Sequence, residues 1–234
     1  MARRRFFVPQ AQDGQAEIAG DDAKHLSQVL RVEKGQLFEL SDNQSLYLGQ
    51  VESVEKSRVR FVIMERLPEP APEIPVHLLA ALFKFDRLEW LIEKATELGV
   101  TSIRFVKAER SEKGLEKAAE KRIDRWRKIA LEASQQSRRW KLPELYEPVS
   151  FKAAIGVPAG VRVFLDEARD GSPLREALAQ PLESMALLVG AEGGWTPAER
   201  TAAREAGWAS VSLGERILRA ETAGIAALAV ARMI

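Results

Sequence analysis

The sequence predicts an α/β protein in which a largely parallel sheet covered by helices follows a small β-barrel. Three observations lead to this prediction. Short apolar strands separated by turns fill the region before residue 68, and strands alternate with helices from residue 76 onward. Near the C-terminus, two apolar strands run into glycine loops that each precede a helix. Loops of this kind lie at the carboxyl ends of parallel strands, where open α/β sheets bind ligands.

The N-terminal region has the pattern of a small all-β domain. Residues 58–64 alternate best, with Val59, Phe61 and Ile63 on one side of the expected strand. One short helix is expected after Asp21 and Asp22. The expected strands cover residues 6–8, 36–40, 46–54 and 58–64. Several short strands with one helix favour a barrel.

A proline-rich segment at residues 68–75 separates this region from the rest of the chain. Prolines at alternate positions stiffen a chain and are typical of linkers. We therefore expect two domains, covering residues 1–70 and 71–234.

The C-terminal region alternates between buried strands and amphipathic helices, which indicates a parallel sheet. Asp86 and Glu89 have capping-box spacing at the start of a helix that Gly99 should end. Thr196 and Glu199 mark a second helix start, with proline between them in the first turn. The expected strands cover residues 76–83, 102–106, 161–165, 185–189 and 209–213, and further helices cover about 115–137, 174–179 and 220 onward.

Composition excludes several kinds of site. The chain has no cysteine, which rules out disulfides, a thiolate nucleophile and cysteine metal ligands. His25 and His77 are far apart in sequence, so we expect no metal site. No apolar run approaches membrane-spanning length and the start lacks a signal-peptide apolar region, so we expect a cytoplasmic protein without membrane contact.

Charge is unevenly distributed along the chain. Residues 84–141 contain 16 Lys and Arg against 10 Asp and Glu, a net charge of +6 on a protein whose total is +1. A basic region within a nearly neutral protein indicates a local surface for a polyanion such as RNA.

The two C-terminal loops, within residues 187–194 and 214–223, carry the strongest functional signal. An ordinary strand-to-helix turn needs one glycine, whereas the first loop has Gly190, Gly193 and Gly194. It lacks the Lys-Ser/Thr ending of a phosphate-binding loop and the spacing of a dinucleotide fingerprint. Because each loop also holds an acidic residue, we expect one ligand to be held from two sides.

Six motifs in a fixed order resemble the ribosomal RNA small subunit methyltransferase E family, part of the SPOUT superfamily of knotted methyltransferases. They are residues 25–31, 84–89 continuing to 94–100, 109–111, 132–139 and the two C-terminal loops. The chain departs from the family pattern at Ala191, where proline is usual, and at Gln135, where an acidic residue is usual.

The resemblance implies a PUA-like barrel followed by a SPOUT α/β domain with a trefoil knot in about residues 160–234. It also implies a homodimer that transfers a methyl group from S-adenosyl-L-methionine to N3 of a specific uridine in 16S rRNA of the small ribosomal subunit. Two alternatives are a non-catalytic knotted RNA-binding protein and an RNA methyltransferase that acts on the ribose 2′-OH.

The resemblance places the cofactor between the two loops, with adenine held by backbone groups of the second loop. Glu192 and Glu221 would hydrogen-bond the cofactor or offset its sulfonium charge, but Glu221 would equally well complement the dipole of the last helix. The expected cofactor-binding residues are Leu165, Gly190, Glu192, Gly193, Gly194, Leu213, Gly214, Ile217, Leu218 and Glu221.

Methylation at uracil N3 requires that N3 lose its proton, and cationic groups would stabilise the uracil anion that develops. The candidate catalytic residues are therefore Arg110, Arg139 and Arg219. Charge runs are usually solvated faces, but the basic residues near the family motifs are candidates for RNA contact. They are Arg3, Arg4, Arg5, Arg31, Lys84, Arg87, Lys94, Arg138 and Lys141.

Overall fold

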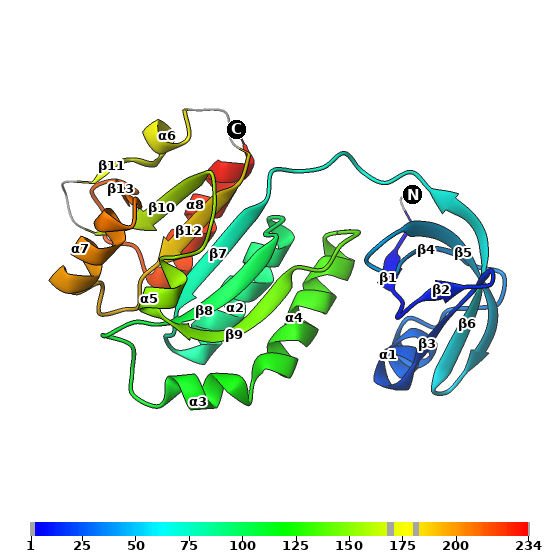
Figure 1. The fold of residues 1–234 in the computed structure, drawn as a ribbon. Helices are drawn as coiled ribbons and strands as arrows, with labels where there is room; N and C mark the ends of the chain where they lie inside the picture. Colours follow the sequence, from blue (N-terminus) through cyan, green and yellow to red (C-terminus); the bar gives the residue numbers. More distant parts are fainter. Residues whose placement is uncertain (1–2, 168–170, 180–182, 234) are drawn as a thin grey trace. The chain divides into compact units, whose positions relative to one another are not determined.

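The computed structural model describes residues 3–167, 171–179 and 183–233, and the chain forms two compact units (Figure 1). The N-terminal unit comprises Met1–Pro72 together with Ser134–Leu142. The C-terminal unit comprises Glu73–Ala133 and Pro143–Ile234. Each unit has a sheet and a hydrophobic core of its own.

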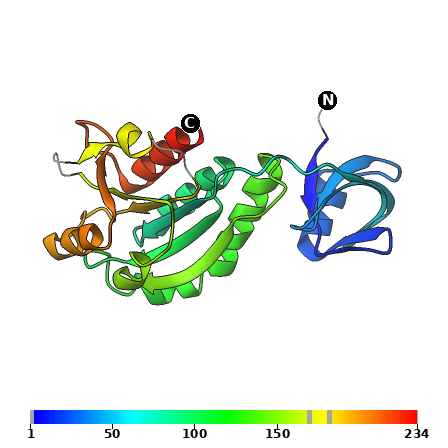
Figure 2. The ribbon, with the colours of Figure 1, turned by 45° about the horizontal axis from the view of Figure 1, so that its top comes forward.

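The N-terminal unit is built around one curled sheet, as Figures 1 and 2 show. Its described strands lie in the order β1-β4-β5-β6-β3-β2, and all neighbours are antiparallel except β1 and β4. The strands are β1 (Arg5–Phe7), β2 (Ala11–Gln12), β3 (Gln15–Ala19), β4 (Leu37–Ser41), β5 (Leu46–Glu55) and β6 (Arg58–Leu67). Apolar residues at alternate positions, such as Ile18, Leu40 and Phe61, face the inside and form the core.

One helical segment closes this core, in agreement with the prediction. Helix α1 (Gly20–Lys24) continues directly into a π-helical turn, η1 (His25–Val29), and buries Ala23 and Leu26. The short hairpin of β2 and β3 was not predicted. Its turn is Asp13-Gly14, with φ of 52° and 76°, a pair that favours tight hairpins.

The C-terminal unit has an all-parallel sheet, which confirms the predicted fold class. The described strands lie in the order β11-β13-β10-β12-β7-β8-β9. They are β7 (Val76–Ala81), β8 (Ser102–Lys107), β9 (Glu144–Ser150), β10 (Val161–Leu165), β11 (Ser172–Pro173), β12 (Met185–Val189) and β13 (Ala209–Ser212). The central strands are buried on both faces, as their near-continuous apolar runs require.

Helices cover both faces of this sheet. Side chains of α2, α3, α4, α6 and α8 join the core on one face, whereas α5 and α7 pack on the other. The helices are α2 (Phe85–Glu97), α3 (Leu115–Glu120), α4 (Ile123–Gln136), α5 (Phe151–Ala154), α6 (Leu174–Ala177), α7 (Pro197–Glu205) and α8 (Ala220–Arg232).

Two local predictions for this unit were wrong. The long helix expected at 115–137 is two helices, α3 and α4, because the chain turns at Lys121 and Arg122. The apolar stripe continues through Ala119, Ile123 and Trp126, so helical periodicity does not reveal the break. Helix α2 begins one residue before Asp86, with Lys84 as N-cap, so Asp86 does not cap it. Strand β9 was not predicted, because its exposed positions are polar and it contains a proline.

The last helix, α8, packs closely on α2 and on strand β12. Gly224 makes this approach possible, because a Cβ atom there would lie 2.9 Å from Leu91 Cδ1 and 3.5 Å from Val189 Cγ2. Since the first turn of α8 lines the pocket described below, this contact fixes one wall of the pocket. The trefoil knot in about residues 160–234 stays a prediction.

Replacing Gly224 with valine should lower the free energy of unfolding by about 1–3 kcal/mol, because the added carbons overpack a fully buried contact. Thr222→Val is the matched control, since it puts the same side chain on an exposed position of the same helix. Urea unfolding of both variants measures the difference. Equal stabilities of the two variants would show that the Gly224 contact is not tightly packed.

Candidate functional site

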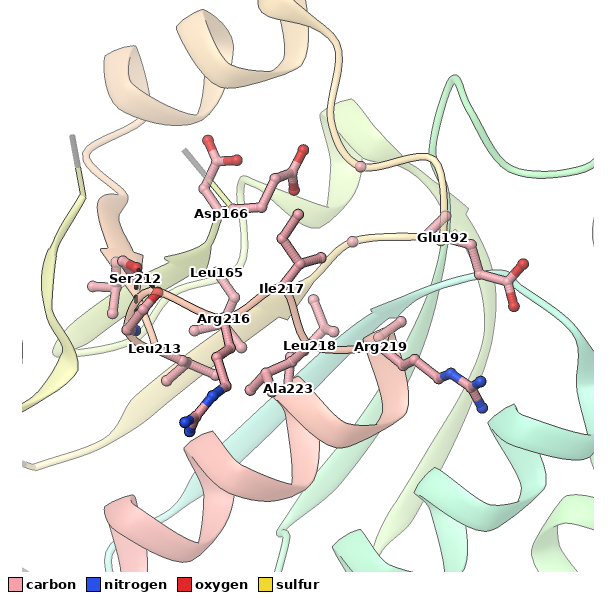
Figure 3. Close-up of a pocket in the computed structure, with 18 of the residues that line it drawn as sticks. Leu165, Asp166, Glu192, Ser212, Leu213, Arg216, Ile217, Leu218, Arg219 and Ala223 are labelled. Atoms are coloured by element: carbon pink, nitrogen blue, oxygen red, sulfur yellow. Dashed lines mark hydrogen bonds between the residues drawn. The ribbon is translucent and has the colours of Figure 1, made fainter. Parts of the chain in front are cut away.

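A pocket of about 610 Å³ lies at the carboxyl ends of three neighbouring parallel strands. Strand β10 pairs with β12 on one side and with β13 on the other, and the loops after these three strands form the pocket walls (Figure 3). The start of α8 contributes Ala220 and Ala223, and α2 contributes Arg87. The pocket therefore gathers segments that are more than a hundred residues apart in sequence.

Nine of the ten predicted cofactor-binding residues line this pocket. They are Leu165, Gly190, Glu192, Gly193, Gly194, Leu213, Gly214, Ile217 and Leu218. The exception is Glu221, which is buried in the first turn of α8 and does not line the pocket.

Trp195 anchors the loop that follows β12. Its side chain is fully buried, packs on Phe164 at a ring-centroid distance of 4.8 Å, and donates a hydrogen bond from Nε1 to the carbonyl of Leu165 at 2.9 Å. A Cβ at Gly190 would lie 3.0 Å from the Trp195 ring nitrogen, so glycine is needed for the loop to pass over the indole. The indole thus links the ends of β10 and β12.

The buried carboxylate of Glu199 fixes the other end of this loop. As predicted, Thr196 and Glu199 form a capping box, with Glu199 Oε2 accepting from the Thr196 N–H at 2.9 Å. Glu199 Oε1 also accepts from the N–H of Glu109, which follows β8, at 2.8 Å. The neighbouring Arg110 donates from Nη1 to the Gly193 carbonyl at 2.8 Å. The loop after β8 therefore holds the glycine loop in place.

An arginine of α7 holds the end of β10. Arg200 binds both carboxylate oxygens of Asp166, at 2.7 and 2.8 Å, and one oxygen of Glu167 at 3.0 Å. These ion pairs raise the pKa of Arg200 above its usual value, with the hydrogen bond to Asp166 as the main cause. Two-point binding of this kind fixes the direction of a carboxylate as well as its distance. Asp166 therefore stands at the pocket wall in a set position, and Glu167 is paired with the same arginine.

The loop after β13 leaves its backbone open. Gly214 has a φ of 110°, which side-chain-bearing residues rarely adopt, and its N–H donates to Ser212 Oγ. In the described part of the chain, no hydrogen bond engages the N–H groups of residues 215–219. Ile217 is 86% exposed at the pocket, an unusual position for a large apolar side chain (Figure 3). This loop offers polar backbone groups and apolar surface to a flat, partly polar ligand.

The side chain of Arg87 extends from α2 to the loop after β12. Its Nη1 donates to Glu192 Oε1, and its Nε lies 3.9 Å from Oε1 of the buried Glu221. The sequence assigned Arg87 to RNA contact, whereas the structure puts it in the pocket wall.

The candidate catalytic arginines occupy different places. Arg219 is exposed and lines the pocket, and Arg110 lies beside the pocket with its guanidinium on the Gly193 carbonyl. Arg139 belongs to the N-terminal unit, where its Nε donates to the Lys141 carbonyl.

Some of the remaining predicted RNA-contact residues have local structural partners, and the others are exposed. Arg5 is bound to Glu39 and to the Arg138 carbonyl, and Lys94 is bound to Glu93 and Glu97, so both have local structural partners. Lys141 stacks over Trp140, with its Nζ 4.2 Å from the ring centroid. The exposed members of the set are Arg3, Arg4, Arg31, Lys84, Arg138 and Lys141.

Sequence reasoning missed five polar residues of the pocket. They are Asp166, Glu167, Ser212, Glu215 and Arg216. Asp166 and Glu167 directly follow a correctly predicted strand, so the rule that ligands bind at carboxyl strand ends would have found them.

Comparison with known proteins identifies the family. Residues 69–232 match the RNA methyltransferase domain family, and residues 18–64 match the RNA methyltransferase PUA domain family. The chain belongs to this family of RNA methyltransferases. It is 33% identical to ribosomal RNA small subunit methyltransferase E of Bacillus subtilis, over 90% of this chain and 87% of that protein. It is 34% identical to the protein of the same name from a Synechocystis species, over 98% of this chain and 77% of that protein.

Solved structures agree with this assignment. The crystal structure of a ribosomal RNA small subunit methyltransferase E from Neisseria gonorrhoeae, bound to S-adenosyl methionine, superposes with a TM-score of 0.88 at 28% identity. The match covers 99% of this chain and 98% of that one. The predicted family and the two-part fold are therefore confirmed.

The described residues hold neither a membrane-spanning helix nor a cluster of metal ligands. Within them, no helix is both long and apolar enough to cross a membrane. Nor do the same residues bring together three or more His, Cys, Asp or Glu side chains in an arrangement that could hold a metal ion.

Glu199→Gln should lower the free energy of unfolding by about 1–3 kcal/mol. Glutamine has one acceptor oxygen, so either the Thr196 or the Glu109 N–H loses its partner in a buried place. Glu205→Gln makes the same change at an exposed position of α7 and serves as control. Urea unfolding that gives both variants the stability of the wild type would contradict this role of Glu199.

Proposed function

We propose that this protein transfers the methyl group of S-adenosyl-L-methionine to N3 of a uridine in 16S rRNA of the small ribosomal subunit. The observation that supports it most strongly is the pocket between the loops after β12 and β13, in a chain of this methyltransferase family. A relative with the same fold over nearly the whole chain is bound to S-adenosyl methionine.

The pocket suits each part of the proposed cofactor. The unengaged N–H groups of residues 215–219 offer donors to the adenine nitrogens, and the side chains of Leu165, Leu213 and Leu218 offer apolar surface to its ring. Acidic side chains at the wall favour the positively charged sulfonium and ammonium groups. Those of Asp166 and Glu167 are held in position by Arg200.

The reaction needs little from the protein beyond position and charge. The uracil N3 must lie in line with the sulfonium–methyl bond, and a large part of a barrier can be removed by such alignment. N3 gives up its proton to water and attacks the methyl carbon, while the C–S bond breaks and S-adenosylhomocysteine leaves with both electrons of that bond. A cation beside the uracil stabilises its anion.

We assign that charge to Arg219 first, because it is exposed and lines the pocket. Arg110 already donates to Gly193 and so supports the loop as well. Arg139 stays a proposed catalytic residue on the ground of the family resemblance alone.

RNA recognition is proposed for the exposed basic side chains Arg3, Arg4, Arg31, Lys84, Arg138 and Lys141. Residues 1–70 would form the RNA-binding domain and residues 71–234 the methyltransferase domain. We also propose that the protein works in the cytoplasm as a homodimer, as the family resemblance implies.

Gly193→Val should weaken the binding of S-adenosyl-L-methionine at least tenfold. The new Cβ would lie 3.2 Å from Arg110 Cβ, so the loop must move away from its support. Isothermal titration calorimetry measures the affinity, with Gly156→Ala as control, since Gly156 lies outside the pocket lining and has room for a Cβ. An unchanged affinity in Gly193→Val would remove the glycine loop from the cofactor site.

Small subunits that lack the modification, treated with the protein and S-adenosyl-L-methionine, should yield 3-methyluridine on nucleoside mass spectrometry. Arg219→Ala should lower kcat by at least tenfold with little change in cofactor affinity, because its charge acts on the developing anion. A 2′-O-methylated nucleoside would instead identify a ribose methyltransferase. Binding without any methylated product would identify a non-catalytic RNA-binding protein.

A further inference from the structure

Arg87 lies between two carboxylates that differ greatly in burial. Its Nη1 is bound to Glu192, whose side chain is 39% exposed, and its Nε lies 3.9 Å from Glu221, whose side chain is 5% exposed. The three residues come from α2, from the loop after β12 and from the first turn of α8. All three segments border the proposed cofactor pocket.

Glu221 is held in place by burial but is poorly satisfied. Its Oε2 is buried and has no hydrogen-bond partner among the described residues, and its Oε1 is at ion-pair rather than hydrogen-bond distance from Arg87. Leaving a buried carboxylate oxygen unpaired costs more than leaving an exposed one. The N-terminal turn of α8 offsets part of this cost. A closer approach by the Arg87 guanidinium would offset more of it.

Glu192 is the opposite case. It lies on an exposed loop at the pocket wall (Figure 3), and an exposed ion pair adds little to the stability of a protein. Water can therefore replace Arg87 as its partner at small cost. Of the two carboxylates on Arg87, Glu192 is the one that can leave.

We propose that Arg87 is the anion-binding residue of this pocket, with Glu192 as an exchangeable counter-ion and Glu221 as the residue that positions the guanidinium. A carboxylate or phosphate oxygen of the ligand replaces Glu192 on Nη1, while Glu221 keeps Nε in place. This inference rests on the proposed function. Two sources fit the same chemistry, namely the carboxylate of the methionine part of the cofactor and a phosphate of the RNA.

The proposal gives the two glutamates opposite effects on one arginine. Removing the charge of Glu192 removes a competitor, so the ligand anion should bind more tightly. Removing the charge of Glu221 loosens Arg87, so the anion should bind more weakly. If Glu192 instead contacted the cofactor's ammonium group directly, its removal would weaken binding.

The experiment measures binding to the full chain in two arms. Calorimetry with S-adenosyl-L-methionine alone tests the cofactor carboxylate, and filter binding of 16S rRNA at a fixed salt concentration tests the RNA phosphate. The variants are Glu192→Gln, Glu221→Gln, Arg87→Gln and each glutamate change combined with Arg87→Gln. Glu215→Gln is the control, because it removes the same charge from another exposed residue of the pocket wall.

In the arm whose ligand supplies the anion, Glu192→Gln should bind that ligand about two- to fivefold more tightly than the wild type does. This is the gain expected for the loss of an exposed competing ion pair. Glu221→Gln should bind at least about tenfold more weakly in the same arm. Both effects should disappear in the Arg87→Gln background. A change in the calorimetry arm identifies the cofactor's carboxylate, and a change in the filter-binding arm identifies RNA phosphate.

Several results would overturn the proposal. They are weaker binding in Glu192→Gln, an equal gain in Glu215→Gln, and effects that persist without Arg87. If Glu221→Gln weakens binding only because it unfolds, its effect will persist in the Arg87→Gln background as well. In each of these cases a wild type that binds S-adenosyl-L-methionine leaves the proposed function intact. A wild type that does not bind it overturns the proposed function too.

Discussion

Parallel pairing of three strands is the constraint on which the pocket depends. Because β12, β10 and β13 are neighbours and run in one direction, their carboxyl ends meet at one edge of the sheet. The loops that follow must then face one another across that edge. The adenine-binding backbone and the acidic pocket wall proposed for this protein come from the loops after those three strands.

Side-chain contacts anchor the loops after β12 and β10. Trp195 and Glu199 fix the two ends of the loop after β12, Arg110 supports its middle, and Arg200 holds the end of β10. Such anchoring fixes the loops after β12 and β10 in place before a ligand arrives. A site that positions its ligand through rigid backbone loses little entropy when the ligand binds.

The sequence predicted the sheet, the capping box at Thr196 and most of the pocket, because these depend on local patterns. Apolar runs, glycine clusters and cap residues act within a few positions of one another. The features that sequence did not predict lack such a local pattern. The break between α3 and α4 does not interrupt the apolar stripe, and the exposed positions of β9 are polar. Arg87 reaches Glu192 across 105 positions of sequence, which no local pattern encodes.

The central claim is that the space between the loops after β12 and β13 holds the methyl donor. A crystal structure of this protein grown with S-adenosyl-L-methionine tests it most directly. The account predicts density for the adenine against residues 213–218, with the methyl group directed toward the side of the pocket where the target base would meet Arg219. Donor density elsewhere on the protein, with this pocket filled only by solvent, would contradict it.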